Sequence, residues 1–160
     1  MSFNHFDAKG QAVMVDISGK EATLRIAVAG ATVNMKQETV TMILEGKAAK
    51  GDVLGVARLA GIAAAKRTPE LIPLAHPLAL QGVSVEFDPD PAAGSIRVKA
   101  TVKAFDRTGV EMEAMTAASV AALTVYDMCK GADRGITINE VALLQKEGGK
   151  SGVYRREENR

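Results

Sequence analysis

The sequence predicts an α+β domain in which helices cover one face of an antiparallel sheet. Apolar residues alternate over residues 83–87 and 96–102, on either side of a turn at 89–94 that contains proline and glycine, which is the pattern of a β-hairpin. Alternation also marks two segments near the N-terminus and one after residue 135, and segments with helical spacing lie between them. Strands paired by a hairpin, together with helices long enough to cover them, are typical of the α+β class.

The first third of the chain predicts two strands followed by two helices. Alternation predicts a short strand over residues 13–17 and a longer one over residues 27–35. Helical spacing follows, and Gly46 is a candidate for the end of that helix. Asp52 can cap a second helix that reaches about Lys66. Small residues dominate this second helix, so it is expected to pack closely against its neighbours.

The middle of the chain predicts a loop, a hairpin and a strand that leads into a long helix. The segment 68–76 contains two prolines and precedes a third, so it is expected to be extended and rigid. After the hairpin, residues 110–113 alternate apolar and acidic side chains, which predicts a strand with Glu111 and Glu113 on one face. A helix rich in small residues is expected from about Ala114.

Charged residues interrupt the core-forming pattern of this long helix. Along one side, Val120, Leu123, Asp127 and Lys130 recur at i, i+3, i+7 and i+10, so an apolar stripe that should face the core or a partner ends in an ion pair. One interpretation is structural: a solvated acidic strand and a lysine that complements the helix C-terminus. The other is a functional site, because four charges bracket one strand-to-helix unit.

Length and composition indicate a single domain that spans residues 1–160. The last predicted strand covers residues 136–144, and mobility is expected for the N-terminus, about residues 1–10, and for the charged tail, about residues 146–160. Hydrophobic residues make up 47% and charged residues 24% of the chain, as in globular proteins. A net charge of +1 and 4% aromatic residues argue against a nucleic-acid partner, which would require a basic field or stacking platforms.

The sequence also predicts a cytoplasmic protein that has no membrane segment. The first ten residues, MSFNHFDAKG, lack the basic patch and apolar run of a signal peptide. The longest stretch of small apolar residues, around 114–125, is shorter than the roughly 20 residues that cross a bilayer. Cys129 is the one cysteine, which suits a reducing compartment.

Two further residues are candidates for a site, each with a structural alternative. Lys50 precedes a predicted helix start, where free amides can hold phosphate oxygens, although a solvated loop lysine would have the same spacing. His76 stands in the stiff loop and could contact a ligand or bond the backbone. No metal site is predicted, because His5 lies near the terminus and no zinc-ligand spacing is present. GGKS at 148–151 is not a P-loop, since the required earlier glycine falls at Leu144.

Three motifs in one order resemble the MoaC family, the cyclic pyranopterin monophosphate synthases of molybdenum cofactor biosynthesis. They are KGDVLGVARLAGIAAAKRTPELIPLAHPL at 50–78, TGVEMEAMTAASVAALTVYDMCK at 108–130 and GGKSG at 148–152. The resemblance implies a ferredoxin-like sheet and a homohexamer, a trimer of dimers, with sites between subunits. It implies a lyase that converts 3',8-cyclo-7,8-dihydroguanosine 5'-triphosphate into cyclic pyranopterin monophosphate and pyrophosphate.

The resemblance also implies roles for individual residues. Lys50 and Lys130 would be the acid/base pair, with Asp127 orienting Lys130. For a lysine to act as a base, burial and a second cation must lower its pKa against the opposing pull of Asp127. The substrate-binding residues would be Glu113, Met112 and Glu111 at the heterocycle, Leu74, Ala75 and His76 along the substrate, and Lys66, Lys146 and Arg25 at the phosphates. The sequence requires no cofactor, although a triphosphate can carry Mg²⁺ into the site.

The chain departs from the family pattern near two of these residues. Ala75 stands where a cysteine often precedes the loop histidine, and Ala48 and Ala49 replace a histidine-rich approach to Lys50. Only a side-chain role at position 75 is put in doubt. The alternatives are a non-catalytic module that binds a purine nucleotide or assembles with other proteins, and an enzyme that acts on an unrelated purine nucleotide.

Overall fold

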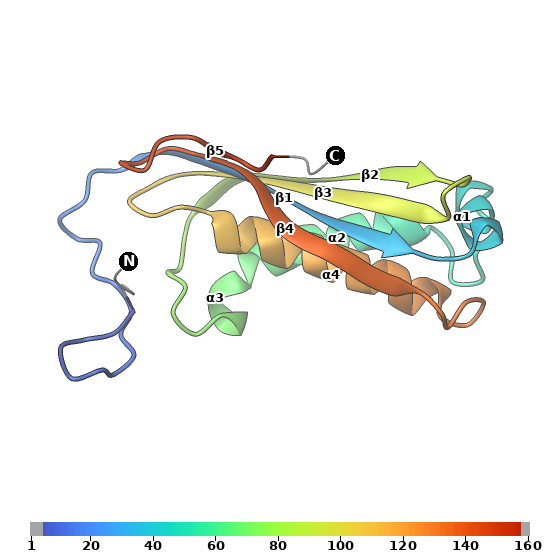
Figure 1. Ribbon diagram of the computed structural model, residues 1–160, viewed down its shortest axis with the longest axis horizontal. Helices are drawn as coiled ribbons and strands as arrows, with labels where there is room; N and C mark the ends of the chain where they lie inside the picture. The colour runs from blue at the N-terminus through green and yellow to red at the C-terminus, as the bar shows by residue number, and fades with distance from the viewer. Residues whose placement is uncertain (1–4, 158–160) are drawn as a thin grey trace.

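A five-stranded antiparallel sheet, with helices packed on one of its faces, forms the body of the protein (Figure 1). The computed structural model describes residues 5–157. The strand order is β2-β3-β1-β4-β5, so the predicted α+β, ferredoxin-like arrangement is confirmed. The elements are β1 (Thr23–Asn34), α1 (Gln37–Leu44), α2 (Val53–Lys66), α3 (Thr68–Leu71), β2 (Leu80–Asp90), β3 (Ser95–Asp106), α4 (Glu111–Cys129), β4 (Thr137–Glu147) and β5 (Tyr154–Arg155).

Strand β1 lies at the centre of the sheet and carries part of the face that the helices cover. Ala27 and Ala29 are fully buried on this face, whereas Ile26 and Val28 point to the opposite, partly exposed face. β1 pairs with β3 in an unbroken register, with Ala29 opposite Ala100, and with β4 in a register that shifts at two irregularities. The short side chains of the covered face allow α4 to lie close to the strands.

The two long helices, α2 and α4, meet at Gly61. A Cβ atom at this position would lie 2.9 Å from the carbonyl oxygen of Ala117 and 3.2 Å from the Cβ atom of Ala121. These distances leave no room for a side chain between the helices. The close packing predicted from the small residues of 53–66 is therefore confirmed.

Gly61→Val is expected to lower the free energy of unfolding by about 1–3 kcal/mol, because the added atoms overpack this contact. Urea denaturation followed by circular dichroism would measure the loss. Ala63→Val places the same side chain on an exposed position of the same helix and controls for the weak helix propensity of valine. Equal losses in the two variants would contradict an origin in helix packing.

Most local signals in the sequence produced the expected elements. The Asp52 carboxylate accepts a hydrogen bond from the Gly55 amide at 2.9 Å and caps α2. Gly46, with a φ of 66°, follows the end of α1. β2 and β3 form the predicted hairpin, and Gly94 in its turn also has a φ of 66°. These signals are local, so they could be read without knowledge of the tertiary structure.

Two predicted segments were wrong. Residues 13–17 belong to no strand, and an isolated bridge between Phe6 and Ala12 precedes them. Alternation forms a strand only where a neighbour offers its backbone groups. The expected extended loop at 68–76 begins with the short helix α3, in which Pro69 occupies the first turn. Proline is tolerated there because the first amides of a helix have no intrahelical partner.

The predicted strand at residues 110–113 was also wrong, because α4 begins at Glu111. Glu111 and Glu113 lie in its first turn, where carboxylates complement the free amides and the helix dipole. In a helix, residues two apart do not share a face, so the two carboxylates do not lie side by side as expected. In the tail, β4 extends to Glu147 and β5 pairs with it; mobility of this segment stays a prediction.

Candidate active site

Asp127 joins two lysines from distant parts of the chain into one cluster. Its Oδ1 accepts a hydrogen bond from Lys130 Nζ at 2.7 Å, and its Oδ2 accepts one from Lys50 Nζ at 3.1 Å. Lys50 Nζ also donates to the backbone oxygen of Asp127 at 2.8 Å. All three side chains are about half exposed, so a ligand or another chain can reach them. We call these residues the lysine cluster.

The fold builds the lysine cluster where α2 begins and α4 ends. Lys50 stands two residues before the Asp52 cap, on a connection in which Gly51 adopts a φ of 90°. Asp127 lies in the last turn of α4, whose carbonyl oxygens have no intrahelical partner, so Lys50 can satisfy one of them. Lys130 follows directly at the helix C-cap, where a cation also complements the dipole.

Asp127 and Lys130 hold each other in the ionised state. The hydrogen bond from Lys130, followed by that from Lys50, holds the pKa of Asp127 below its ordinary value. In turn, the hydrogen bond and charge of Asp127 raise the pKa of Lys130. The sequence had required a lowered lysine pKa for a base. Within one chain the pull of Asp127 prevails, so Lys130 is an ammonium ion, able to donate a proton.

A second group of the candidate residues lines a cavity of about 750 Å³ at the opposite end of α4. Its walls are mostly apolar and come from the segments 15–17 and 72–78, while the start of α4 contributes acidic residues. The predicted substrate-binding residues in this cavity are Leu74, Ala75, His76, Glu111, Met112 and Glu113. The apolar walls fit a flat heterocycle, and its polar edge can meet the acidic residues.

Glu113 and His76 are the most constrained polar residues of this cavity. Glu113 is only 3% exposed, and burial is the main cause that raises its pKa, with a smaller contribution from the charge of Glu111. Burial therefore shifts this carboxyl group toward its protonated form, in which it can donate a hydrogen bond. His76 Nε2 lies 2.7 Å from the backbone oxygen of Val15 and donates to it in the Nε2–H tautomer. The backbone bond, one of the two predicted alternatives, is therefore present, and His76 also lines the cavity, while its contact with a ligand stays a prediction.

A second cavity, of about 920 Å³, adjoins the first and is cationic. The two share part of their lining, including Lys20 and Glu111. The cations that line the second cavity are Lys20, Arg25, Arg107, Lys146 and Lys150. Several cations without a matching number of carboxylates suit the oxygens of a polyphosphate. Lys66 lies in the last turn of α2 and lines neither cavity, so the structure does not place it with the other predicted phosphate residues.

Two cations of this cavity already have partners in the protein. Lys146 Nζ lies 3.0 Å from Glu111 Oε1. Arg25 donates to the backbone oxygens of Asp106 and Arg107 at 3.1 and 3.2 Å, and thereby holds the loop before α4. Sequence reasoning missed Lys20 and Arg107. Lys20 follows Gly19 and Arg107 stands two residues before Gly109, and this proximity to glycine is a signal that could have found them.

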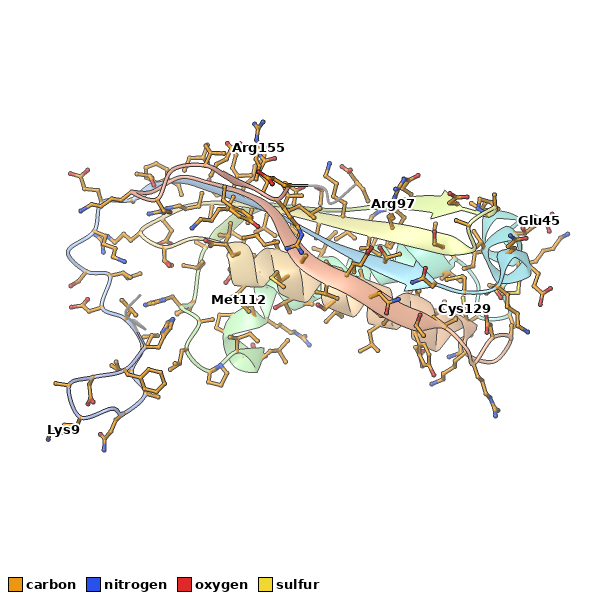
Figure 2. The ribbon with its side chains drawn as sticks, in the orientation of Figure 1. Lys9, Glu45, Arg97, Met112, Cys129 and Arg155 are labelled. Atoms are coloured by element: carbon orange, nitrogen blue, oxygen red, sulfur yellow. The ribbon has the colours of Figure 1, made fainter. Side chains whose placement is uncertain are left out.

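The lysine cluster and the two cavities lie at opposite ends of α4. Figure 2 shows this separation, with Met112 near one end of the helix and Cys129 at the other. A rise of about 1.5 Å per residue puts Glu113 and Asp127 roughly 20 Å apart along the helix axis. The sequence suggested that the acidic residues and the lysine–aspartate pair form one site. Within one chain the structure does not bring them together.

Over residues 5–157, no three His, Cys, Asp or Glu side chains are grouped so that they could hold a metal ion. In the same residues, no helix has the length and apolarity needed to cross a bilayer.

Comparison with known proteins finds relatives along the whole chain. A family profile described as "MoaC family" matches residues 14–149. A cyclic pyranopterin monophosphate synthase of Geotalea uraniireducens is 72% identical over 160 residues, which is 100% of both chains. Proteins of the same name from Geobacter metallireducens and Geobacter sulfurreducens are 69% and 66% identical over 158 residues, which is 99% of each chain. The chain belongs to the MoaC family.

Proposed function

We propose that this protein is an enzyme that forms cyclic pyranopterin monophosphate, an early step of molybdenum cofactor biosynthesis. Its substrate would be 3',8-cyclo-7,8-dihydroguanosine 5'-triphosphate, and pyrophosphate would be released. Relatives of this name that match over the full length support the proposal. The structural observation that carries it is the lysine cluster, in which one carboxylate holds two lysines at 2.7 and 3.1 Å.

The lysine cluster fits a reaction that needs several proton transfers. Opening one ring and closing another moves protons between nitrogen and oxygen atoms, which positioned side chains can donate and accept. Lys130, whose pKa Asp127 raises, is suited to act first as the acid. Lys50 shares the same carboxylate and would be the second member of the pair. Asp127 orients both ammonium groups.

The two adjoining cavities fit the two halves of this substrate. The apolar cavity would hold the guanine-derived heterocycle, with Glu113 and Met112 at its edge and Leu74 to His76 along it. The cationic cavity would hold the phosphates through Arg25 and Lys146. On binding, a phosphate would replace Glu111 as the partner of Lys146. The triphosphate can carry Mg²⁺ into the site, and the sequence requires no other cofactor.

A second copy of the chain would complete the site. The lysine cluster and the cavities lie at opposite ends of α4, so a twofold axis across the middle of α4 would place the lysine cluster of one copy beside the cavities of the other. The helix surface near this point is apolar and exposed: Leu123 is 57% and Leu59 on α2 is 70% exposed. In the predicted stripe, Leu123 thus points away from the core of its own chain, where a partner chain could cover it.

These considerations favour a homo-oligomer whose active sites lie between subunits. The hexamer implied by the family resemblance, a trimer of dimers, stays a prediction that light scattering or mass photometry can check. A cytoplasmic location and the lack of nucleic-acid partners also stay predictions. The first follows from the single cysteine, and the second from the low net charge and the few aromatic residues.

The direct test supplies the cyclised nucleotide triphosphate to the purified protein and measures pyrophosphate and pterin. Formation of both products in equal amounts is expected. A module that only binds purine nucleotides would retain the substrate and release neither. GTP itself is the control substrate, since it lacks the added ring bond and should give no pterin.

Asp127→Asn is expected to lower kcat by about 10²-fold, because the two lysines lose the group that orients them. The change should also lower the pKa of Lys130, since Asp127 is the group that raises it. If Lys130 acts as the acid, the alkaline limb of the kcat profile then moves to lower pH. Stability should hardly change, because exposed ion pairs contribute little.

Asp88→Asn is a matched control, because Asp88 also pairs with a cation on the surface, Arg97 at 2.6 Å, but lies outside both groups of site residues. It should keep the kcat and the pH profile of the wild type. If Asp127→Asn instead keeps the kcat of the wild type across pH 6 to 10, Asp127 forms only a surface ion pair and has no role in catalysis.

A further inference from the structure

Asp133 is a buried carboxylate that has no part in the proposed chemistry. It is 3% exposed and lies in the connection between α4 and β4, three residues after Lys130. A buried carboxylate is costly unless it is hydrogen-bonded on all sides. The hydrogen-bond partners of this carboxylate therefore indicate which segments it holds together.

The Asp133 carboxylate bonds to the start of α1. Its Oδ2 accepts a hydrogen bond from the Lys36 amide at 2.9 Å and one from the Thr39 hydroxyl at 3.3 Å. Lys36 occupies the N-cap position of α1 and makes no side-chain cap of its own, and its amide is bonded instead to Asp133, 97 residues away. These bonds, that from Lys36 first, hold the pKa of Asp133 below its ordinary value despite burial.

The same residue is fixed to the end of α4. Its amide donates to the backbone oxygen of Cys129 at 3.0 Å, and its Oδ1 accepts from the Gly135 amide at 3.0 Å. These bonds hold the connection against the last turn of the helix, next to Asp127 and Lys130. On the other side, α1 leads through the connection 45–52 to Lys50.

We infer that Asp133 is a positioning residue for the lysine cluster. It joins the end of α4, which carries Asp127 and Lys130, to the start of α1, the helix that leads to Lys50, at a point that is almost closed to solvent. This inference rests on the proposed function for its catalytic consequence, but not for its geometric one. Loss of the carboxylate would let the two segments move apart and would loosen the contact of Lys50 with Asp127.

The test compares Asp133→Asn with Val102→Ala, a variant that removes buried atoms from β3, away from the lysine cluster. In Asp133→Asn, an amide group faces donors, so the link to α1 weakens. We expect kcat to fall about 10-fold or more at a temperature where both variants are folded, because small displacements of catalytic groups are costly. Val102→Ala, at a similar loss of stability, should keep its kcat.

A second measurement does not depend on activity. Brief acetylation followed by mass spectrometry reports how freely each lysine amine reacts. Modification of Lys50 and Lys130 should rise in Asp133→Asn and that of Lys99, on the open face of the sheet, should not. If Asp133→Asn does not fold, Thr39→Val removes one of the three bonds and should give a smaller effect in the same direction.

Wild-type kcat together with wild-type labelling in a folded Asp133→Asn would overturn the inference. So would an equal loss of kcat in Val102→Ala, since that would trace the effect to stability alone. If the wild-type protein releases no pyrophosphate from the cyclised substrate, the proposed function fails, and the labelling still decides whether Asp133 positions the two lysines.

Discussion

Lys130→Ala and Lys50→Ala should each lower the rate of pyrophosphate release by about 10² to 10⁴-fold, the range expected for loss of a general acid or base. Both lysine side chains are about half exposed, and within the lysine cluster each bonds only to Asp127, at the end of α4. The fold should therefore survive the removal of either lysine. Substrate affinity should change less than kcat, because proton transfer acts in the transition state. Single-turnover kinetics would separate the two effects.

Two further variants sharpen this prediction. Lys130→Arg keeps a cation beside Asp127 but cannot lose its proton near neutral pH, so it should be as inactive as the alanine variant if proton transfer is required. Lys47→Ala removes a surface lysine three positions before Lys50, one that pairs only locally with Glu45, and should keep full activity. Near-normal turnover of Lys130→Arg would show that Lys130 contributes a positive charge to substrate binding and does not transfer a proton.

The double variant, Lys50→Ala with Lys130→Ala, should be hardly slower than either single variant. Residues that act as one unit are not additive in their effects on rate. A product of the two separate losses would show that the lysines act on independent steps, and the shared carboxylate of Asp127 would then need another explanation.

The parts of this structure that could be predicted from sequence are those set by neighbours in the chain. The β2–β3 hairpin followed from alternation and a turn, and the start of α2 followed from Asp52 alone. The start of α4 could not be read in this way. Its alternating acidic residues at 111 and 113 fit a strand face as well as a helix N-terminus, and only the packing of the following residues on the sheet decides between them.

In the candidate site, too, local contacts could be predicted from the sequence and long-range contacts could not. The pair formed by Asp127 and Lys130 is three residues apart and follows from helical geometry. The contact between Lys50 and Asp127 spans 77 residues, so it depends on the antiparallel packing of α2 and α4 and had support only from the family resemblance. The separation of the lysine cluster from Glu113 could not be foreseen, because a strand followed by a helix leaves their relative direction open, whereas one helix from Glu111 to Cys129 fixes the two groups at its opposite ends.

That separation leads to the second large expected effect, recovery of activity when two inactive chains are mixed. Lys130→Ala disables the lysine cluster, and Glu113→Leu disables the cavity with a side chain of similar volume. In a random mixture of dimers, half contain one chain of each kind. If each site takes its lysine cluster from one chain and its cavity from the other, a mixed dimer has one intact site, so the mixture should reach roughly a quarter of the wild-type rate.

Mixing Lys130→Ala with Lys50→Ala provides the matched control. Asp127 bonds both lysines within one chain, so both variants damage the same half of the site, and no arrangement of the two chains restores an intact lysine cluster. This second mixture should stay inactive. Recovery in both mixtures would mean that Lys50 serves the cluster of another subunit, whereas recovery in neither would place a complete site within one chain. Recovery in the first mixture alone requires that the two ends of α4 work on one substrate from different subunits.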